Sequence, residues 1–522
     1  MSQFEQSKIS SIVIVGGGTA GWLTAGILAS ELRSRIQRKE LCITLIESPN
    51  IPTIGVGEGT WPTMPNTLNR MGVSETEFIR ECDASFKQGS KFVNWGSEEN
   101  TENNFYYHPF DVPMASMEGV LPEYWLEQEQ SKSLAESFTV QQALCEANKA
   151  PKNITHAEFG REANYGYHLD AGKFSNFLKK HCIEKLGVKH IFADVEDVTL
   201  DPSGNIKSIS LGENGPFTAD LFVDCTGFKS LLLGKALNVK FNSVSGMLFA
   251  DTAIVTQVKY PQMNAPIKPY TQSTAQTCGW IWDIGLPTRR GVGYVYSSEY
   301  TDTENAKKEI DNYISKTTIN AQQSDYRTIQ FTPGYRDKFW HKNCVAVGLS
   351  AGFLEPLEAS ALVMVELSAY MIAEQLPATK SALYVTEKRF NKRFRYHWQR
   401  AIDFLKLHYI LSKRNTPFWL DNRKSESIPD SLQHLMVLWR HQVPKATDFE
   451  LSAELFNAPS YQFVLYGTHF RSELLFSMPQ REQEYMQQQV LHNQQLTGKL
   501  IDKMPDHRSL INKIVQYGLA KV

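Results

Sequence analysis

The sequence predicts an α/β fold: a Rossmann-like core with an inserted antiparallel sheet, followed by a C-terminal helical cap. Three observations lead to this prediction. A glycine-rich turn directly follows an apolar run near the N-terminus, two more buried-strand patterns end in glycine turns, and such turns are lost after about residue 380. A chain of 522 residues with 42% hydrophobic content can bury a large core. We expect residues 1–380 to form that core and residues 381–522 a mainly helical subdomain.

Residues 11–47 are typical of one βαβ unit. The β-branched run at 11–15 has the composition of a strand buried in a parallel sheet. It is followed by the GxGxxG turn at 16–21, a helix expected at about 19–33, and a second apolar strand at 41–46. This order of elements predicts a dinucleotide site at the end of the first strand.

Each glycine of this GxGxxG pattern has a separate physical role, and so has the acid that ends the second strand. Gly16 permits the tight turn, Gly18 lets a pyrophosphate approach the backbone and the helix N-terminus, and Gly21 lets the helix pack on the strand. Glu47 ends the second strand, where a carboxylate accepts hydrogen bonds from a ribose diol. The pattern serves NAD and FAD alike, and no second fingerprint for a nicotinamide is found.

Later segments return to the same core. Buried strands that end in small residues are predicted at 219–227 and 343–352, so the nucleotide domain is interrupted by insertions, and residues 240–300 are typical of antiparallel sheet. After about residue 380 the chain changes to long charged and aromatic helices, expected at 381–412, 428–441 and 480–497.

Composition excludes several classes of protein. The net charge of −2 gives no reason to expect nucleic acid or an anionic membrane as a partner. The seven cysteines contain no Cys-x-x-Cys pair, so we predict no metal site and a reducing, cytoplasmic setting. Residues 1–11 lack the features of a secretory signal, and the apolar stretch at 12–29 is broken by five glycines.

Trp280 and Trp282 lie two residues apart in the stretch GWIWDI at 279–284. On a strand, such residues point to the same face, so the two indoles are expected to stand side by side as a wall. The plainer interpretation is a pair of core aromatics. Inside a nucleotide-binding enzyme, the same pair suggests a barrier.

These segments together resemble the flavin-dependent halogenases of the tryptophan-halogenase type. The matching segments run in family order through the first 360 residues: 16–21, GVGEGTWP at 55–62, ASFK at 84–87, KFVNW at 91–95, YHPF at 107–110, 279–284, GYVYSS at 293–298 and 348–360. The resemblance implies FAD, supplied in its reduced form by a separate flavin reductase. It also implies chlorination or bromination of an indole-like or other electron-rich aromatic substrate.

By this resemblance, Lys87 and Glu358 are the catalytic residues. Lys87 would meet hypohalous acid, by hydrogen bonding or as a haloamine, which requires a buried site that lowers its pKa or strengthens its charge. Glu358 would stabilise the arenium intermediate or remove its proton. A helix expected from Pro356 to Met371 offers the alternative that Glu358 is an acid favoured by a helix N-terminus.

The resemblance also assigns the surroundings of this pair. In the family, the tryptophan wall keeps organic substrate away from the flavin; its pattern is WxWxIP, and Gly285 stands here in place of the proline. The backbone amides of Ser360 and Ala361 would bind halide; this chain has Ala359-Ser360-Ala361 where tryptophan halogenases usually have Ser-Thr-Gly. The further positions implied to contact FAD are Thr19, Ala20, Gly57, Glu58, Val195 and Leu349.

Substrate residues are implied with one departure from the tryptophan halogenases. His108 and Phe110 match the wall on which an indole stacks, and Phe456 stands where the family carries a stacking tryptophan. Pro444 and Lys445 fall where a tyrosine pair holds the polar end of tryptophan.

Leu451 falls where a glutamate binds the ammonium group, although Glu450 would take that place if the register slipped by one residue. A charged amino-acid tail without partners is costly to bury. We therefore expect free tryptophan not to be the preferred substrate.

Two other functions remain open from the sequence. One is a single-component flavin monooxygenase, which would need pyridine-nucleotide access and an open path to the flavin. The other is an FAD-binding protein that does not halogenate. The oligomeric state is also open, a homodimer included.

Overall fold

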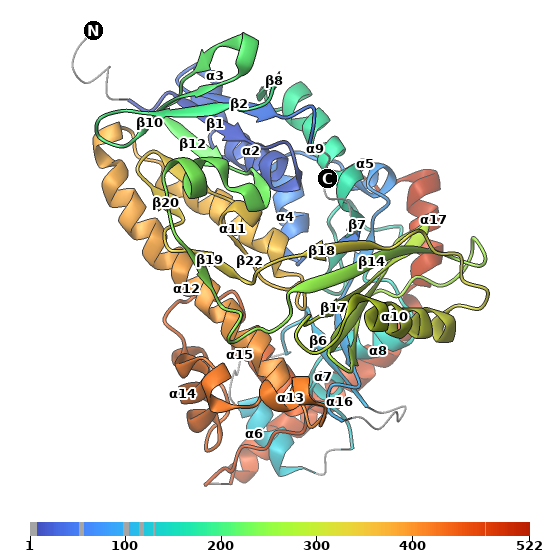
Figure 1. Cartoon of the computed structure of the whole chain (residues 1–522). Helices are drawn as coiled ribbons and strands as arrows, with labels where there is room; N and C mark the ends of the chain where they lie inside the picture. The colour runs from blue at the N-terminus through green and yellow to red at the C-terminus, as the bar shows by residue number, and fades with distance from the viewer. Residues whose placement is uncertain are drawn as a thin grey trace.

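A mostly parallel sheet forms the nucleotide-binding half of the chain (Figure 1). The computed structural model describes residues 8–51, 57–97, 104–113, 120–128, 131–475 and 477–521. The six strands of this sheet lie in the order β20 (Trp340–His341), β21 (Cys344–Ala346), β12 (Leu221–Asp224), β1 (Ser11–Val15), β2 (Cys42–Glu47) and β8 (Lys189–Phe192). All are parallel to their neighbours except β20 at the edge. The strands predicted at 11–15, 41–46, 219–227 and 343–352 are confirmed as its four inner strands.

The helix α2 (Thr19–Glu31) packs between α9 (Ala171–Glu184) and α11 (Ser360–Gln375). Every residue of α2 from Gly21 to Ala29 is buried, which accounts for its lack of a polar face. Because α11 begins at Ser360 and β1 ends at Val15, the nucleotide-binding core is completed only by the second half of the chain. This confirms that insertions interrupt it.

A second, largely antiparallel sheet lies beside the first (Figure 1). Its order is β18 (Arg327–Gln330), β14 (Thr252–Lys259), β17 (Arg289–Tyr296), β16 (Gly279–Gly285), β15 (Thr271–Gln276), β5 (Gly89–Val93) and β6 (Phe105–Pro109). The antiparallel sheet expected within 240–300 is confirmed. It is extended by β5 and β6 from the N-terminal part of the chain, with β5 parallel to β15.

Smaller elements connect the two sheets. A three-stranded sheet has the order β3 (Gly57–Gly59), β7 (Gly166–Asp170) and β4 (Ser85–Lys87), and places Lys87 opposite Gly166. The remaining strands and helices before residue 380 are α3 (Arg33–Gln37), α4 (Thr63–Arg70), α5 (Glu75–Glu81), α6 (Val120–Glu127), α7 (Leu134–Phe138), α8 (Gln141–Glu146), β9 (Asp197–Leu200), β10 (Ile206–Ser210), β11 (Pro216–Phe217), β13 (Phe241–Ser243), α10 (Thr303–Thr317), β19 (Gly334–Arg336) and β22 (Gly352–Phe353).

The C-terminal region is helical, as expected. Its helices are α12 (Leu383–Ile410), α13 (Pro417–Asp421), α14 (Asp430–Trp439), α15 (Ala458–Gly467), α16 (Gln480–Lys503) and α17 (His507–Tyr517). The long helix α12 runs from the edge of the nucleotide-binding sheet to the lower helices (Figure 1), so its two ends serve different parts of the molecule. Over the described ranges, no helix is long and apolar enough to cross a membrane.

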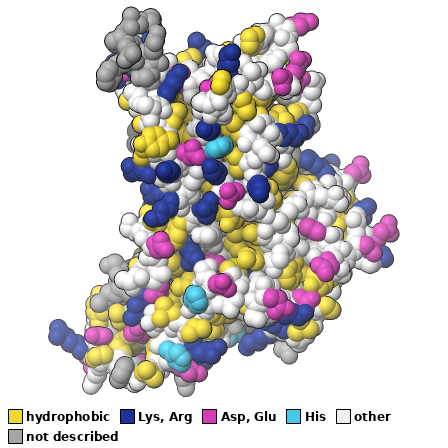
Figure 2. All heavy atoms as spheres, turned by 60° about the vertical axis from the view of Figure 1, so that its left-hand side comes forward, with side chains coloured by type: hydrophobic (Ala, Val, Ile, Leu, Met, Phe, Trp, Pro, Cys, Tyr) yellow, Lys and Arg dark blue, Asp and Glu magenta, His cyan; other side chains and the backbone are white. Residues whose placement is uncertain are grey.

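The exposed face of α12 carries Lys388, Arg389, Lys392 and Arg393. On the face turned forward in Figure 2, basic side chains are mixed with acidic and apolar ones. This mixture agrees with the small net charge of the chain.

The glycine turn after β1 has the shape that a pyrophosphate requires. Gly16 has a φ of 119°, and a Cβ there would lie 2.2 Å from the carbonyl oxygen of Cys225. A Cβ on Gly21 would lie 1.9 Å from the carbonyl oxygen of Gly16, whereas a Cβ on Gly18 would meet no atom within 4 Å. No side chain caps the first amides of α2. The turn therefore combines open space with free backbone donors, the arrangement that binds phosphate anions.

We predict that two alanine substitutions in this turn affect different properties, one the stability of the fold and the other the binding of FAD. Gly21→Ala forces a methyl group against the Gly16 carbonyl and should lower the melting temperature. Gly18→Ala points into open space, so it should leave the melting temperature unchanged but weaken FAD binding by about tenfold or more, equivalent to ~1.4 kcal/mol. Thermal unfolding and flavin fluorescence titration measure the two effects. Wild-type FAD affinity in Gly18→Ala would contradict the placement of the pyrophosphate.

Candidate active site

Lys87 is a buried cation at the end of β4. Its side chain has no exposed surface, and its Nζ has no hydrogen-bond partner among the described residues. The Nζ lies 5.1 Å from the centroid of the Phe110 ring, and a Cβ on Gly59 would lie 3.3 Å from this nitrogen. The amine thus occupies a confined space, with an aromatic face on one side and a glycine that leaves room on the other.

Burial lowers the pKa of Lys87 to about 8, although the negative charge of Glu358 opposes the shift. At pH 7, roughly a tenth of the amine is then neutral, compared with well under a thousandth for an exposed lysine. The structure therefore provides the environment in which both charged and neutral forms of this amine are populated near neutral pH.

Glu358 lies in the loop before α11 and is 2% exposed. The expected helix from Pro356 to Met371 is wrong at its start: α11 begins at Ser360, because Ala359 adopts a left-handed conformation with φ 54° and ψ 38°. Glu358 therefore precedes the helix instead of lying in its first turn. Its backbone is held by Trp61, whose Nε1 donates to the Glu358 carbonyl at 2.8 Å.

Two imidazoles meet the Glu358 carboxylate at one oxygen. Its Oε1 lies 2.9 Å from Nδ1 of His108 and 3.1 Å from Nε2 of His408. Burial by itself would raise the pKa of Glu358, but these imidazoles outweigh it and hold the pKa at about 2. Glu358 is thus an ionised carboxylate near neutral pH, placed close enough to Lys87 to affect its pKa.

His108 and Phe110 are brought together with Lys87 and Glu358, but Phe456 is engaged elsewhere. The Phe456 ring stacks on Phe404 with centroids 3.8 Å apart and meets the edge of Trp61 at 4.9 Å. It is 1% exposed, and its centroid lies 6.4 Å from that of His108. Phe404 therefore covers one face of the Phe456 ring.

Trp280 and Trp282 lie side by side on β16, as the two-residue spacing predicts. Their ring centroids are 6.1 Å apart, and the exposed fractions of the residues are 0% and 8%. The six-membered ring of Trp282 lies over Gly293 of β17, where a Cβ would come within 2.1 Å. Only glycine at that position leaves the indole its place in the wall.

A second buried acid lies near this wall and was not predicted. Tyr409 donates to Oε1 of Glu355 at 2.6 Å, and burial raises the pKa of Glu355 to about 7. On the same helix as Tyr409, Lys406 donates to Asn422 at 2.8 Å, and burial lowers its pKa to about 7. The only sign of this second buried acid in the sequence was a glutamate three residues before Glu358.

The positions proposed to contact FAD gather around the carboxyl edge of the parallel sheet. Glu47 lies 2.8 Å from Lys179 Nζ and 2.9 Å from His190 Nε2. Thr19 and Ala20 begin α2, and Leu349 follows Gly348, whose added Cβ would lie 2.8 Å from that of Ala20. These contacts place the glycine turn that follows β21 directly against the start of α2.

The other proposed contacts lie on neighbouring segments. Gly57 on β3 faces the backbone of Gly291 on β17, and burial raises the pKa of the half-buried Glu58 to about 7. Val195 follows β8 and is half-buried. For the halide, Ser360 is buried and Ala361 exposed at the start of α11, which has no side-chain cap.

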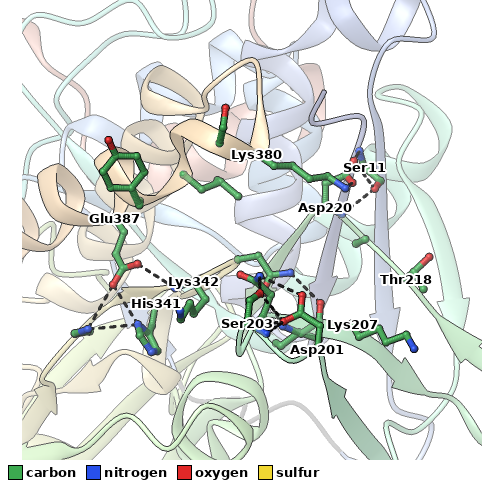
Figure 3. Close-up of a pocket in the computed structure, with 18 residues that line it drawn as sticks. Ser11, Asp201, Ser203, Lys207, Thr218, Asp220, His341, Lys342, Lys380 and Glu387 are labelled. Atoms are coloured by element: carbon green, nitrogen blue, oxygen red, sulfur yellow. Dashed lines mark hydrogen bonds and ion pairs between the residues drawn. The ribbon is translucent and has the colours of Figure 1, made fainter. Parts of the chain in front are cut away.

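A cavity of about 770 Å³ lies away from these residues (Figure 3). It is lined by Ser11, Asp220 and Asn343, which mark the amino ends of β1, β12 and β21. Ligands of open α/β sheets bind at the carboxyl ends of the strands. Its charged groups are also paired across its walls, with Lys380 2.6 Å from Asp220 and His341 3.1 Å from Glu387. We therefore do not assign the dinucleotide to this cavity.

Sequence reasoning missed the residues that surround Glu358 from the helical region. His408 and Phe404 lie on the buried face of α12, four residues apart. Tyr106 precedes the predicted segment at 107–110, and its hydroxyl lies 2.7 Å from Nδ1 of His408. The apolar periodicity of α12 indicates which face is buried, but it gives no sign that this face reaches a loop some 50 residues earlier.

Comparison with known proteins gives a consistent result. The family model described as tryptophan halogenase matches residues 11–481. The chain is 34% identical over 448 residues to tryptophan 7-halogenase RebH of Lentzea aerocolonigenes, covering 83% of this chain and 82% of that protein. A solved tryptophan halogenase from Shewanella frigidimarina superposes with a TM-score of 0.94 at 45% identity, over 99% of both chains.

A flavin-dependent halogenase from Brevundimonas sp. BAL3, named BrvH, superposes with a TM-score of 0.83 at 30% identity, over 97% of this chain and 99% of that one. The family match spans most of the chain and includes the glycine turn, the tryptophan wall and the Lys87–Glu358 pair. The chain therefore belongs to the tryptophan halogenase family and is a flavin-dependent halogenase of aromatic substrates.

Proposed function

We propose that this halogenase uses reduced FAD from a separate reductase and acts on indole, or on a larger molecule that presents one, in preference to free tryptophan. The observation that carries the proposal is a buried Lys87 beside Phe110, within electrostatic range of an ionised Glu358. The charged residues of 444–451 are not buried. This arrangement favours an electron-rich aromatic ring without a charged tail.

The residues present fit the flavin nucleotide. The open backbone at Gly18 and the uncapped amides of α2 would hold the pyrophosphate, and Glu47 the ribose, in exchange for its contacts with Lys179 and His190. When bound and reduced, FAD supplies hypohalous acid together with oxygen and halide. The amides of Ser360 and Ala361 would hold the halide at the start of α11.

Lys87 has two modes of action toward hypohalous acid. As an ammonium group, it donates a hydrogen bond that polarises the acid. As a neutral amine, it would attack the halogen of the acid, so that the oxygen–halogen bond breaks, a haloamine forms and water leaves. Because its Nζ has no other hydrogen-bond partner among the described residues, either form can be directed at the incoming oxidant. Glu358 would then remove the proton from the halogenated carbon, or stabilise the cationic ring before the proton leaves.

The segment proposed to replace the amino-acid clamp offers little to a charged substrate. Pro444 is buried, with its carbonyl accepting from Gln462 at 2.7 Å, and Lys445 lies 3.4 Å from Glu123. Leu451 is half-buried and Glu450 is exposed. A buried ammonium or carboxylate left without partners costs several kcal/mol, on the order of 2 or more. An indole without that tail avoids this cost.

The first test concerns the source of reduced flavin. Purified protein given NADH, FAD, halide and indole should form no product until a flavin reductase is added, because the chain carries one dinucleotide fingerprint. Product is measured by mass spectrometry. Robust turnover without reductase would favour the single-component monooxygenase alternative.

The second test concerns Lys87 and Glu358. Lys87→Ala should abolish halogenation while FAD binding and flavin oxidation persist, because the lysine acts after the oxidant has formed. Glu358→Gln should lower kcat by about 10² or more. Regioselective halogenation at the wild-type rate in Lys87→Ala would show that the lysine is not catalytic.

The pH dependence of the wild type separates the two modes of Lys87. Its pKa is about 8, so the neutral amine increases and the ammonium form decreases as the pH rises through 8. A haloamine route predicts that kcat rises over this interval, and a hydrogen-bonding route predicts that it falls. We expect Glu358 to add no inflection, since its carboxylate is ionised throughout. A kcat independent of pH from 7 to 9 would argue against both modes.

The third test is a competition between indole and tryptophan. We expect indole to have the higher kcat/KM, with halogenation at its electron-rich C3 when the ring is bound loosely. The products are separated and identified by mass spectrometry and NMR. Preferential consumption of tryptophan, with halogen on its benzo ring, would contradict the proposed substrate class.

A further inference from the structure

Two histidines from different parts of the fold contact the Glu358 carboxylate. His108 comes from β6, and His408 from the C-terminal half of α12, which lies about 50 residues later than Glu358 in the chain. Both imidazoles contact the same oxygen, Oε1. Because both closest approaches are to Oε1, Oε2 is the oxygen left for the substrate proton.

The proton positions on His408 follow from its partners. Tyr106 lies 2.7 Å from Nδ1 of His408, and burial together with Glu358 raises the pKa of Tyr106 well above 10. Tyr106 therefore keeps its proton, but a neutral hydroxyl can donate or accept. The carboxylate next to Nε2 can only accept, so it favours the ring proton on Nε2 and leaves Nδ1 to accept from Tyr106. Burial lowers the pKa of His408, which leaves the ring neutral with its one proton on Nε2. Nε2 lies 3.1 Å from Oε1 of Glu358, a close contact with the carboxylate that lacks the alignment of a full hydrogen bond.

The ring of His408 cannot turn away from this position. It stacks on Phe92 with centroids 4.5 Å apart, and Phe404 and Trp95 meet it edge-on at 5.3 and 5.9 Å. Phe92 also stacks on Tyr106 at 4.8 Å. The same aromatic cluster therefore holds the donor to His408 and the ring of His408 itself.

We propose that His408 is a positioning residue for Glu358, held in one tautomer by Tyr106, and that this pair keeps the carboxylate ionised and aimed during proton removal. The inference rests on the proposed role of Glu358. His408 itself touches neither substrate nor flavin in this account. It acts by directing Oε2 and by favouring the charged form of the carboxylate.

The experiment measures kcat and KM for an aromatic that the wild type halogenates, across pH 5 to 9, with reductase in excess. His408→Leu removes the donor and should lower kcat by about 10- to 100-fold, with a smaller change in KM. It should also bring an acid limb into the kcat profile, because the Glu358 pKa rises when a donor to its charged form is lost. The titratable groups facing this carboxylate are Lys87, His108, Tyr106 and His408 itself.

Two further variants separate positioning from packing. His408→Gln places an amide donor near the position of Nε2 and should recover most of the loss. Tyr106→Phe should shift the acid limb in the same direction by a smaller amount, and it remains informative if His408→Leu folds poorly. His397 is the matched control: it is buried on the same helix, and neither of its ring nitrogens has a partner among the described residues. His397→Leu should keep the wild-type pH profile.

Combining His408→Leu with Glu358→Gln completes the test. If His408 acts through Glu358, the double variant should be no slower than Glu358→Gln alone. An unchanged kcat and acid limb in His408→Leu, equal losses in the Leu and Gln variants, or an independent further loss in the double variant would each overturn the proposal. Wild-type kcat in Glu358→Gln would instead refute the proposed role of Glu358.

Discussion

The burial of opposite charges in one dry space is the constraint on which this active site depends. Lys87 has no hydrogen-bond partner among the described residues, and its pKa falls to about 8, while Glu358 keeps its charge because two imidazoles contact it. An ion removed from water is tolerated only when nearby groups compensate for the lost hydration. The fold compensates the two charges unequally. Two imidazoles contact the Glu358 carboxylate, whereas the Lys87 amine has no hydrogen-bond partner among the described residues and is available to the oxidant.

The scaffold achieves this by joining segments that are distant in the chain. The small sheet β3-β7-β4 supplies Lys87, the antiparallel sheet supplies His108 and the tryptophan wall, the loop before α11 supplies Glu358, and α12 supplies His408. The left-handed conformation of Ala359 lets the chain turn into α11 immediately after Glu358. The carboxylate can then point toward β6 and α12, while the first amides of α11 remain free to bind an anion.

The sequence predicted the features that depend on local patterns. The GxGxxG turn, the parallel strands at 11–15, 41–46 and 219–227, the side-by-side pair Trp280 and Trp282, and the long C-terminal helices follow from spacing and composition. The start of α11 was misplaced because proline commonly opens a helix, and a left-handed alanine has no sequence signal. His408 and Phe404 were missed because their roles arise from tertiary contacts. A periodic apolar face shows that a residue is buried, but not what it is buried against.

The pKa of Lys87 shows most directly whether the buried amine and the buried carboxylate influence each other. It can be measured by 13C NMR of protein labelled at lysine Cε, with the Lys87 resonance assigned by its loss in Lys87→Arg. We expect titration near pH 8, and a lower midpoint in Glu358→Gln, because the carboxylate charge favours the ammonium form. Titration above pH 10, unaffected by Glu358→Gln, would show an exposed lysine without a charged neighbour and would contradict the burial of opposite charges in this site.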